Sequence, residues 1–347
     1  MRLRAVVNGA ARPDAVPAPT GEAAAFHRSL DGYRPTPLRD LSQTAAELGL
    51  AAVKLKDESD RLGLPAFKVL GASWAVERAL REAPGTHTLV AASAGNHGRA
   101  VAHVAALRDL SCRVYLPARS SGARREAIAA EGADVVVVPG TYEEAVARAA
   151  ADGEQDGVLE IADVGTSGSA RWVIDGYATL FGEIDEDFDL VVVPVGVWSL
   201  GAAAARYGAA TGTEVIAAEP ATAACLAASL AAGRPTAVTT PGTTMAGLDC
   251  AEVSETAWPV LRDGIRGAIA VGEGETHYAM RELAAAGLAI GDSGAAPLAA
   301  LRALVDDADC AHLRAAAGLS ASSRVLLIGT EGPTDPDGYR GTLEARG

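Results

Sequence analysis

The sequence predicts an α/β protein with mostly parallel sheets, and three observations support that fold class. Short runs rich in valine, isoleucine and leucine alternate with alanine-rich stretches whose apolar residues recur at helical spacing. Several runs, such as ADVVVVP at 133–139 and LVVVPV at 190–195, are apolar throughout, as strands are when helices cover both faces of a sheet. The length of 347 residues suits one large domain or two of medium size.

The predicted elements follow one another as strand and helix. The predicted strands are 53–56, 88–93, 113–117, 133–139, 190–195, 214–220 and 324–330. Helices are predicted within 98–110, 124–132, 142–153, 200–208, 276–287 and 296–307. Such sheets bind ligands at the carboxyl ends of their strands, so the turns there are the first places to search for a site. The polar stretches near 82–87 and 183–189 are the predicted domain boundaries.

Composition excludes several classes of protein. Hydrophobic residues make up 49% of the chain and charged residues 21%, which is a globular balance. Forty-four acidic against thirty basic residues give a net charge of −14, so neither nucleic acid nor an anionic membrane is an expected partner. No apolar run is long enough to span a bilayer. The four cysteines are scattered and neither they nor the histidines show metal-ligand spacing, so we expect a cytoplasmic protein without disulfides or a bound metal.

Lysine is rare, and its placement is informative. Only three of the thirty basic residues are lysines, and all three lie between positions 54 and 68. A primary amine can lose its proton and form a Schiff base, which guanidinium cannot, so a retained lysine can mark a catalytic site. Lys68 begins a helical pattern in GLPAFKVLGASWAV, where apolar neighbours would favour its neutral form; the alternative is a surface lysine at a helix start. Lys54 and Lys56 share one strand face and are expected to be solvated or paired with Asp57 and Glu58.

Two turns at strand ends are rich in glycine. The first, Ser93-Ala94-Gly95-Asn96-His97-Gly98, would expose backbone N–H groups and one amide to an anion or carboxylate; the alternative is a plain turn in which Asn96 caps the helix. The second turn, 195–202, leads into a helix of small residues and could hold a phosphate through backbone N–H groups and the Ser199 hydroxyl. It matches neither the Walker nor the Rossmann glycine pattern.

Asp163 is a further candidate. It ends the apolar segment VLEIAD and precedes Gly-Thr-Ser-Gly. Two interpretations stay open, a general base near a ligand and a turn acid that stabilises the segment after it.

These features together resemble the fold-type II pyridoxal-phosphate enzymes, the tryptophan synthase β-like superfamily. The resemblance rests on the order of PTPL, KLKDES, AFKVLGAS, SAGNHG, a glycine loop after VVVP and a C-terminal strand. EPATAACLAASL, TTMAGLDCAEVSETAW, GDSGAAPLAAL and LLIGTEGPTDPDGYR are similar to the diaminopropionate ammonia-lyase family within it. The resemblance implies two open, twisted, mostly parallel sheets flanked by helices. It also implies a large cofactor-binding domain of 1–82 and 183–347, a small domain of 83–182, and a homodimer.

The resemblance also implies the roles of individual residues. Lys68 would form the Schiff base with pyridoxal 5'-phosphate and act as acid and base at Cα, and Asn96 would hydrogen-bond the phenolic oxygen of the cofactor. Thr330 would be the neutral partner of the pyridine nitrogen. The residues implied to hold the phosphate, mainly through backbone N–H groups, are Gly196, Val197, Trp198 and Ser199. Those implied to bind substrate are Ser93, Ala94, Gly95 and His97.

Two positions depart from the family pattern. Diaminopropionate ammonia-lyases have an aspartate in TDGNHG, taken as the base for the D-isomer, where this chain has Ala94; the second acid of that family matches Asp163. We therefore expect activity on L-substrates with little on D-substrates. Trp198 stands where the phosphate loop normally has glycine, and the backbone donors are expected to survive only if Trp198 needs no positive φ and its indole points away from the phosphate.

The predicted function is α,β-elimination from a small L-amino acid, L-2,3-diaminopropionate or a β-substituted analogue, giving a 2-keto acid and ammonia. Lys68 would be the Cα base and Asp163 would contact or protonate the leaving amine. The alternatives are a serine or threonine dehydratase, or a β-replacement synthase, using the same aminoacrylate intermediate. A non-catalytic ligand-binding relative is the alternative from another class, and intact Lys68, Asn96 and Thr330 argue against it.

Overall fold

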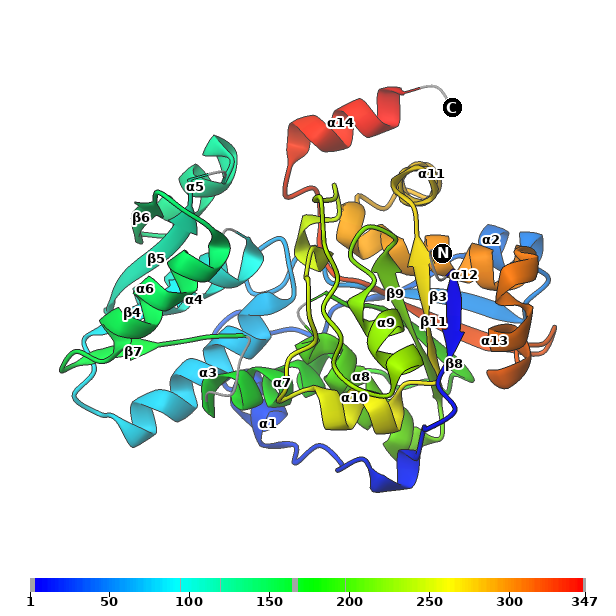
Figure 1. Ribbon diagram of the computed structural model, residues 1–347, viewed down its shortest axis with the longest axis horizontal. Helices are drawn as coiled ribbons and strands as arrows, with labels where there is room; N and C mark the ends of the chain where they lie inside the picture. Colours follow the sequence, from blue (N-terminus) through cyan, green and yellow to red (C-terminus); the bar gives the residue numbers. More distant parts are fainter. Residues whose placement is uncertain (1–3, 94, 119, 164–167, 197, 346–347) are drawn as a thin grey trace.

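The computed structural model describes residues 4–93, 95–118, 120–163, 168–196 and 198–345, and their strands form two sheets (Figure 1). The larger sheet has the order β1-β10-β9-β8-β11-β3-β2 and the smaller one β6-β5-β4-β7. All neighbours are parallel except β1 with β10 and β2 with β3, so antiparallel pairing is confined to the two edges of the larger sheet. The smaller sheet is parallel throughout.

The strands of each sheet come from separate parts of the chain. The larger sheet contains β1 (Ala5–Val7), β2 (Leu38–Asp40), β3 (Ala52–Asp57), β8 (Leu190–Pro194), β9 (Glu214–Pro220), β10 (Gly267–Val271) and β11 (Arg324–Gly329). The smaller sheet contains β4 (Thr88–Ala92), β5 (Ser111–Pro117), β6 (Asp134–Val138) and β7 (Val158–Glu160). We propose that the domain boundaries near 82 and 183 follow this division of the strands.

Helices cover both sheets. They are α1 (Glu22–Arg28), α2 (Ser42–Glu47), α3 (Lys68–Glu82), α4 (Asn96–Leu107), α5 (Gly122–Ala129), α6 (Tyr142–Gly153), α7 (Gly168–Phe181), α8 (Ser199–Thr211), α9 (Cys225–Ala232), α10 (Trp258–Gly264), α11 (Glu273–Ala285), α12 (Asp292–Asp306), α13 (Ala311–Ala316) and α14 (Pro336–Glu344). Figure 1 shows α4, α5 and α6 with the smaller sheet on the left, apart from the larger sheet on the right. Helix α3 packs against both α4 and α7, and α7 packs against α8, so α3 and α7 connect the two halves.

The core explains why the central strands are apolar throughout. In β8, Val191 and Val193 lie in the same cluster as the alanines of α8, whereas Leu190 and Val192 lie in the cluster that contains α12. Successive side chains of a strand point to opposite faces, so each face of this strand is covered by a helix. Two-sided burial is what the unbroken apolar run predicts.

All seven predicted strands are present, and so are the six predicted helices and the helix beginning at Lys68. The sequence analysis did not predict β1, β2, β7 and β10. Three of these are only three residues long, and β1 exists through its pairing with β10, more than two hundred residues away along the chain. Strands of three residues depend on distant partners rather than on a local apolar run, whereas β10 is an apolar run that the sequence analysis passed over.

A buried network of charges holds the segment that leads into α3. Arg61 donates to Glu58 at 2.6 and 2.8 Å and to Glu183 at 2.7 and 2.8 Å, and Lys56 donates to Glu183 at 2.7 Å. The side chains of Arg61, Lys56, Glu58 and Glu183 are each at most 4% exposed. Burial raises the pKa of Glu183, but Arg61 and Lys56 outweigh it and lower that pKa to about 2. The network therefore fixes residues 58–67, which place Lys68.

The network corrects one expectation about the lysines. Lys54 and Lys56 are ion-paired, but Lys56 is buried and pairs with Glu183, while Lys54 pairs with Glu186 at 2.5 Å. The expected partners bind arginines instead, Asp57 to Arg39 and Glu58 to Arg61. The strand register places the lysines, but acids from distant segments neutralise them.

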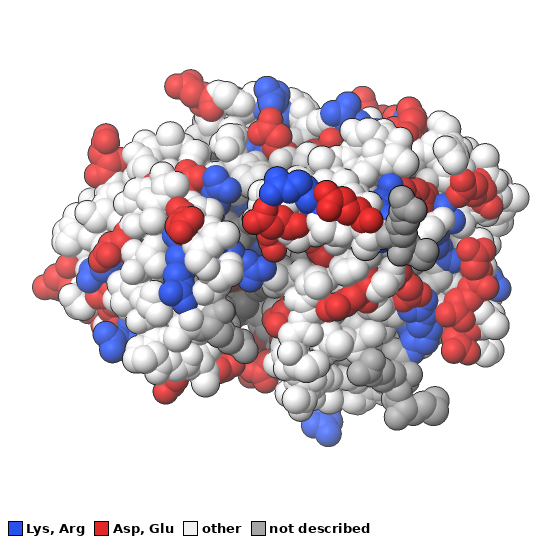
Figure 2. All heavy atoms as spheres, turned by 90° about the horizontal axis from the view of Figure 1, so that it is seen from above, with Lys and Arg blue, Asp and Glu red and all other residues white. Residues whose placement is uncertain are grey.

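The outer surface carries charges of both signs. Figure 2 shows acidic and basic side chains interspersed over one face of the molecule. In the part of the chain that the structure describes, no helix combines the length and the apolar character needed to cross a bilayer.

Candidate active site

The candidate site lies where strand ends of the two sheets meet. The larger sheet contributes the segments after β3, β8 and β11, and the smaller sheet contributes those after β4 and β7. Parallel strands bring their carboxyl ends to one edge of a sheet, which is the usual place for a ligand. The predicted site residues all lie in these five segments.

Lys68 is the first residue of α3 and points into the protein. Its side chain is only 12% exposed, and Nζ donates to Oδ2 of Asp163 at 2.7 Å. The alternative of a surface lysine at a helix start is therefore wrong. The contact joins a helix that follows the larger sheet to the segment that follows β7 in the smaller one.

Asp163 is buried and has several partners. Its side chain is 6% exposed, and its carboxylate lies 3.7 Å from Nδ1 of His97 as well as beside Lys68. The Ser199 hydroxyl donates to the backbone carbonyl of Asp163 at 3.1 Å. Burial by itself raises the pKa of Asp163, but the ammonium of Lys68, which donates a hydrogen bond to the carboxylate, outweighs burial, and the pKa falls below its ordinary value. Of its two open interpretations, this geometry favours an acid that acts at a ligand site.

Asn96 makes a contact that the sequence did not reveal. The helix cap is Gly95 and Asn96 is the first residue of α4, so the alternative of an Asn96 cap is wrong. Its Nδ2 donates to Oε2 of Glu331 at 2.5 Å, which spans the two halves of the molecule. An amide nitrogen has two N–H groups, so one stays available for a ligand while Glu331 fixes the orientation of the amide.

Glu331 is a site residue that sequence analysis missed. It directly follows Thr330, and it is buried. Burial raises the pKa of Glu331, while its hydrogen bonds to Ser293 and Asn96 oppose that shift. The available signal was an acidic residue that directly follows Thr330, at the carboxyl end of β11.

The turn after β4 is built by close packing. A Cβ on Gly98 would lie 2.4 Å from the carbonyl oxygen of Ser93, so this position requires glycine. The N–H of Gly95 donates to the Ser93 hydroxyl at 3.3 Å. The His97 ring is buried, and Nε2 hydrogen-bonds the carbonyl of Ile161 at 2.8 Å. Ala94 lies outside the described residues, so its proposed role and those of its neighbours in substrate binding stay predictions.

The turn after β8 brings backbone N–H groups to the start of α8. Gly196 is required by close approach, because a Cβ there would lie 2.4 Å from Cα of Leu248. Ser199 is the first residue of α8, a helix of 13 residues, and the N-terminus of a helix carries a partial positive charge that favours an anion. Val197, predicted as a phosphate ligand, lies outside the described residues.

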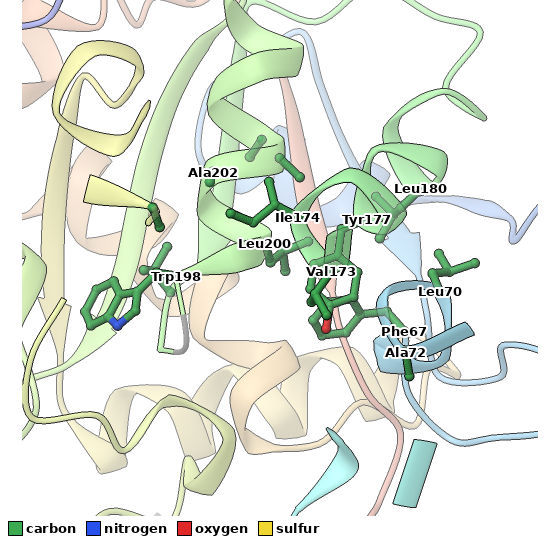
Figure 3. Packing of buried hydrophobic residues seen from close by; sticks show 14 of the residues in the cluster. Phe67, Leu70, Ala72, Val173, Ile174, Tyr177, Leu180, Trp198, Leu200 and Ala202 are labelled. Carbon is green, nitrogen blue, oxygen red and sulfur yellow. The ribbon is translucent and has the colours of Figure 1, made fainter. Parts of the chain in front are cut away.

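Trp198 has a positive φ, which the sequence analysis expected a tryptophan to avoid, so the loop keeps a glycine-like backbone at this position although it carries a side chain. Its φ is 58° and its ψ is −29°, so it takes a left-handed conformation that a glycine would adopt freely. Such a backbone costs about 1–3 kcal/mol. The indole is 3% exposed and lies in the core cluster, and burying it contributes about 4–6 kcal/mol. Burial therefore outweighs the strain, and Figure 3 shows the indole pointing away from Phe67 and Tyr177.

Thr330 follows β11 and is buried next to the start of α3. Its carbonyl accepts a hydrogen bond from the N–H of Phe67 at 3.2 Å, so Thr330 is bonded to the residue that directly precedes Lys68. The structure thus links Lys68, Asp163 and Ser199 directly, and it brings Asn96 and Thr330 to the same strand ends through Glu331 and Phe67.

Comparisons with known proteins define the class of this site. A family model for pyridoxal-phosphate dependent enzymes matches residues 29–330. The chain is 32% identical to the diaminopropionate ammonia-lyase of Salmonella typhimurium, over 92% of this chain and 90% of that protein. The crystal structure of the Escherichia coli diaminopropionate ammonia lyase with an aminoacrylate–PLP azomethine intermediate has a TM-score of 0.89 and 28% identity, covering 98% of this chain and 96% of that one.

A third relative covers less of the chain. The L-threonine dehydratase of Mycobacterium bovis is 33% identical over 210 residues, which are 58% of this chain and 47% of that protein. The match to the family model and the long match to the ammonia-lyase are decisive: the chain belongs to the pyridoxal-phosphate dependent enzymes. Its fold is that of the fold-type II members, and its cofactor is pyridoxal 5'-phosphate.

The strained Trp198 gives a prediction about stability. Trp198→Ala removes the indole but keeps a Cβ at positive φ, so we expect it to lower the free energy of unfolding by about 3–5 kcal/mol. Trp198→Gly opens the same cavity but relieves the backbone strain, so it should be less destabilising than the alanine variant by about 1 kcal/mol. Urea denaturation of the cofactor-free proteins measures both. An alanine variant more stable than the glycine variant would contradict the positive φ.

Proposed function

We propose that this chain eliminates the β-amino group of a small L-amino acid, L-2,3-diaminopropionate or a close analogue, and produces a 2-keto acid and ammonia. The observation that supports this most is the 2.7 Å contact between Lys68 and the buried carboxylate of Asp163. It places a base for the Cα proton next to an anion suited to a cationic leaving group. The similarity to proteins named diaminopropionate ammonia-lyase points to the same reaction.

The residues of the site fit the cofactor group by group. Lys68 offers the primary amine that an aldehyde requires, and the start of α8 at Ser199 offers N–H groups for a phosphate. The second N–H of Asn96 is suited to the phenolic oxygen and the hydroxyl of Thr330 to the pyridine nitrogen. We assign these four residues to cofactor binding, together with Gly196, Val197 and Trp198 in the phosphate loop.

The residues of this chain then divide the work of elimination. When bound, pyridoxal phosphate supplies an electron sink that makes the Cα proton of an attached amino acid removable. Lys68 takes that proton onto Nζ, and Asp163 holds the β-ammonium group while the bond between Cβ and nitrogen breaks and ammonia leaves. With the addition of one water, both nitrogens of diaminopropionate become ammonia and the carbon skeleton becomes a 2-keto acid.

Asp163 also explains why an amine is preferred over a hydroxyl at Cβ. Leaving a buried carboxylate without its cationic partner costs several kcal/mol of free energy. A substrate ammonium replaces the cationic partner when Lys68 is engaged elsewhere, whereas the hydroxyl of serine or threonine brings no charge.

The dehydratase remains the second candidate, because the turn at 93–98 has the sequence typical of dehydratases and a threonine dehydratase matches part of the chain. A β-replacement synthase would use the same base and would need a second substrate.

We also propose that the enzyme works in the cytoplasm as a homodimer on a small amino acid, without nucleic acid or membrane as partners. The four cysteines are all free in the structure, which suits a reducing compartment. Gel filtration with light scattering tests the dimer.

The proposed reaction is tested by measuring products from L-2,3-diaminopropionate and L-serine with the purified, cofactor-loaded enzyme. We expect keto acid and ammonia from diaminopropionate at a kcat/KM at least about 100-fold above that for serine, since a charge pair worth several kcal/mol is made only with the amine.

Lys68→Ala should abolish both reactions. Asp163→Asn should lower kcat/KM for diaminopropionate by about 100-fold and affect serine much less. A serine rate above the diaminopropionate rate would favour the dehydratase. If adding a thiol reduces the keto acid formed and a new amino acid appears in its place, the result would favour the synthase.

The stereochemistry gives a separate prediction. Ala94 stands where the related ammonia-lyases have the aspartate taken as the base for the D-isomer, so this chain offers Lys68 as the Cα base for L-substrates. We expect L-2,3-diaminopropionate to be consumed at least about 100-fold faster than the D-isomer, which is the order of magnitude contributed by a positioned general base. Keto acid formation from each pure enantiomer measures the ratio. Comparable rates would contradict Lys68 as the single Cα base.

A further inference from the structure

The two ring nitrogens of His97 differ in their hydrogen bonding within the described part of the chain. Its side chain is 1% exposed, and Nε2 lies 2.8 Å from the carbonyl oxygen of Ile161. Nδ1 is buried and has no hydrogen-bond partner among the residues that the structure describes. Buried polar atoms are nearly always hydrogen-bonded, so an exception beside a reactive group calls for a functional explanation.

The Ile161 contact fixes which nitrogen carries the proton. A carbonyl oxygen only accepts hydrogen bonds, so Nε2 must be the donor. Burial lowers the pKa of His97 below its ordinary value, which favours the neutral ring, with Asp163 opposing and Lys68 reinforcing that shift. Nδ1 therefore presents a bare lone pair, and it lies 3.7 Å from Oδ2 of Asp163.

Two hydrogen-bond acceptors thus lie side by side next to the reactive lysine. A carboxylate and a bare imidazole nitrogen cannot bond each other without a donor between them. Because Oδ2 of Asp163 and Nδ1 of His97 are 3.7 Å apart, one nitrogen atom can lie about 2.9 Å from each of them, which is an ordinary hydrogen-bond distance. The Lys68 ammonium, 2.7 Å from Oδ2, shows that the carboxylate already accepts a donor of this kind.

We propose that Nδ1 of His97 is the second acceptor, beside the Asp163 carboxylate, for the β-ammonium group of the substrate, which makes His97 a specificity-determining residue. The inference rests on the proposed function and names the part of the site that recognises the leaving group. An ammonium brings three N–H donors and satisfies both acceptors. A hydroxyl brings one donor and leaves one acceptor unpaired in the interior, so the pair selects against serine and threonine.

Two variants of similar size separate the two nitrogens of the ring. In His97→Asn the amide oxygen stands near the place of Nδ1 and keeps an acceptor beside Asp163, but the bond to Ile161 is lost. In His97→Gln the amide N–H reaches toward Ile161 and the acceptor beside Asp163 is lost. The cofactor-loaded proteins are compared through the dissociation constants of L-2,3-diaminopropionate and L-serine, read from the visible absorption of the bound cofactor in the first milliseconds after mixing.

The expected result is a change in the ratio of the two dissociation constants. His97→Gln should weaken diaminopropionate binding by about 10- to 100-fold, as expected for a lost hydrogen bond to a charged group, and serine binding by no more than about threefold. His97→Asn should keep the wild-type ratio within about threefold. Equal weakening of both substrates in the glutamine variant, or the same loss of ratio in both variants, would overturn the proposal; the second outcome would mean that His97 and Asp163 share a proton instead.

A measurement on the wild-type enzyme covers the case in which the variants do not fold. With ¹⁵N-histidine incorporated, the six histidines give a small set of ring signals. The bare Nδ1 of His97 should shift on addition of diaminopropionate and stay unchanged with serine; a shift of equal size with both ligands contradicts the proposal. Because both experiments record binding, they remain decisive when the enzyme binds diaminopropionate without releasing ammonia, an outcome that would remove the proposed function alone.

Discussion

The contact between Lys68 and Asp163 is the interaction on which the site depends. The two residues follow strands of different sheets, and both side chains are buried, so neither charge can be left without the other at low cost. The pairing fixes how the carboxyl ends of the two sheets face each other. The Asn96 to Glu331 bond also spans the two halves, and the Ser199 hydroxyl reaches the carbonyl of Asp163. A polar interior between two open sheets is stable only where such contacts satisfy it.

The segments around Lys68 are held in the same way, by buried charges that must keep their partners. Arg61 and Lys56 neutralise Glu58 and Glu183 in the segment before α3, so the backbone that delivers Lys68 is fixed by charges as well as by packing. Trp198 fixes the loop before α8, where its buried indole outweighs the strain of a left-handed backbone. Rigid placement of this kind is what a site needs when its reacting groups must keep their distances.

Sequence predicts the parts of this molecule that have a local signal. The central strands are apolar throughout because helices cover both faces, and Lys68 stands out because lysine is otherwise nearly absent. The missed parts depend on distant partners: β1 forms only against β10, and Glu331 gains its role only through Asn96, 235 positions away in the chain. The positive φ of Trp198 was missed for the same reason, since the core that stabilises it is assembled from several helices and loops.

The most direct test of the account is to find which lysine holds the cofactor. Borohydride reduction of the loaded enzyme makes the Schiff base permanent, and mass spectrometry of a protease digest then locates the added group. With only three lysines in the chain, the result is unambiguous. The account predicts the group on Lys68 alone, with the other two lysines unmodified because their ammonium groups are held by Glu186 and Glu183, outside the candidate site. Attachment to Lys54 or Lys56, or a stable yellow complex that leaves Lys68 unmodified, would contradict it.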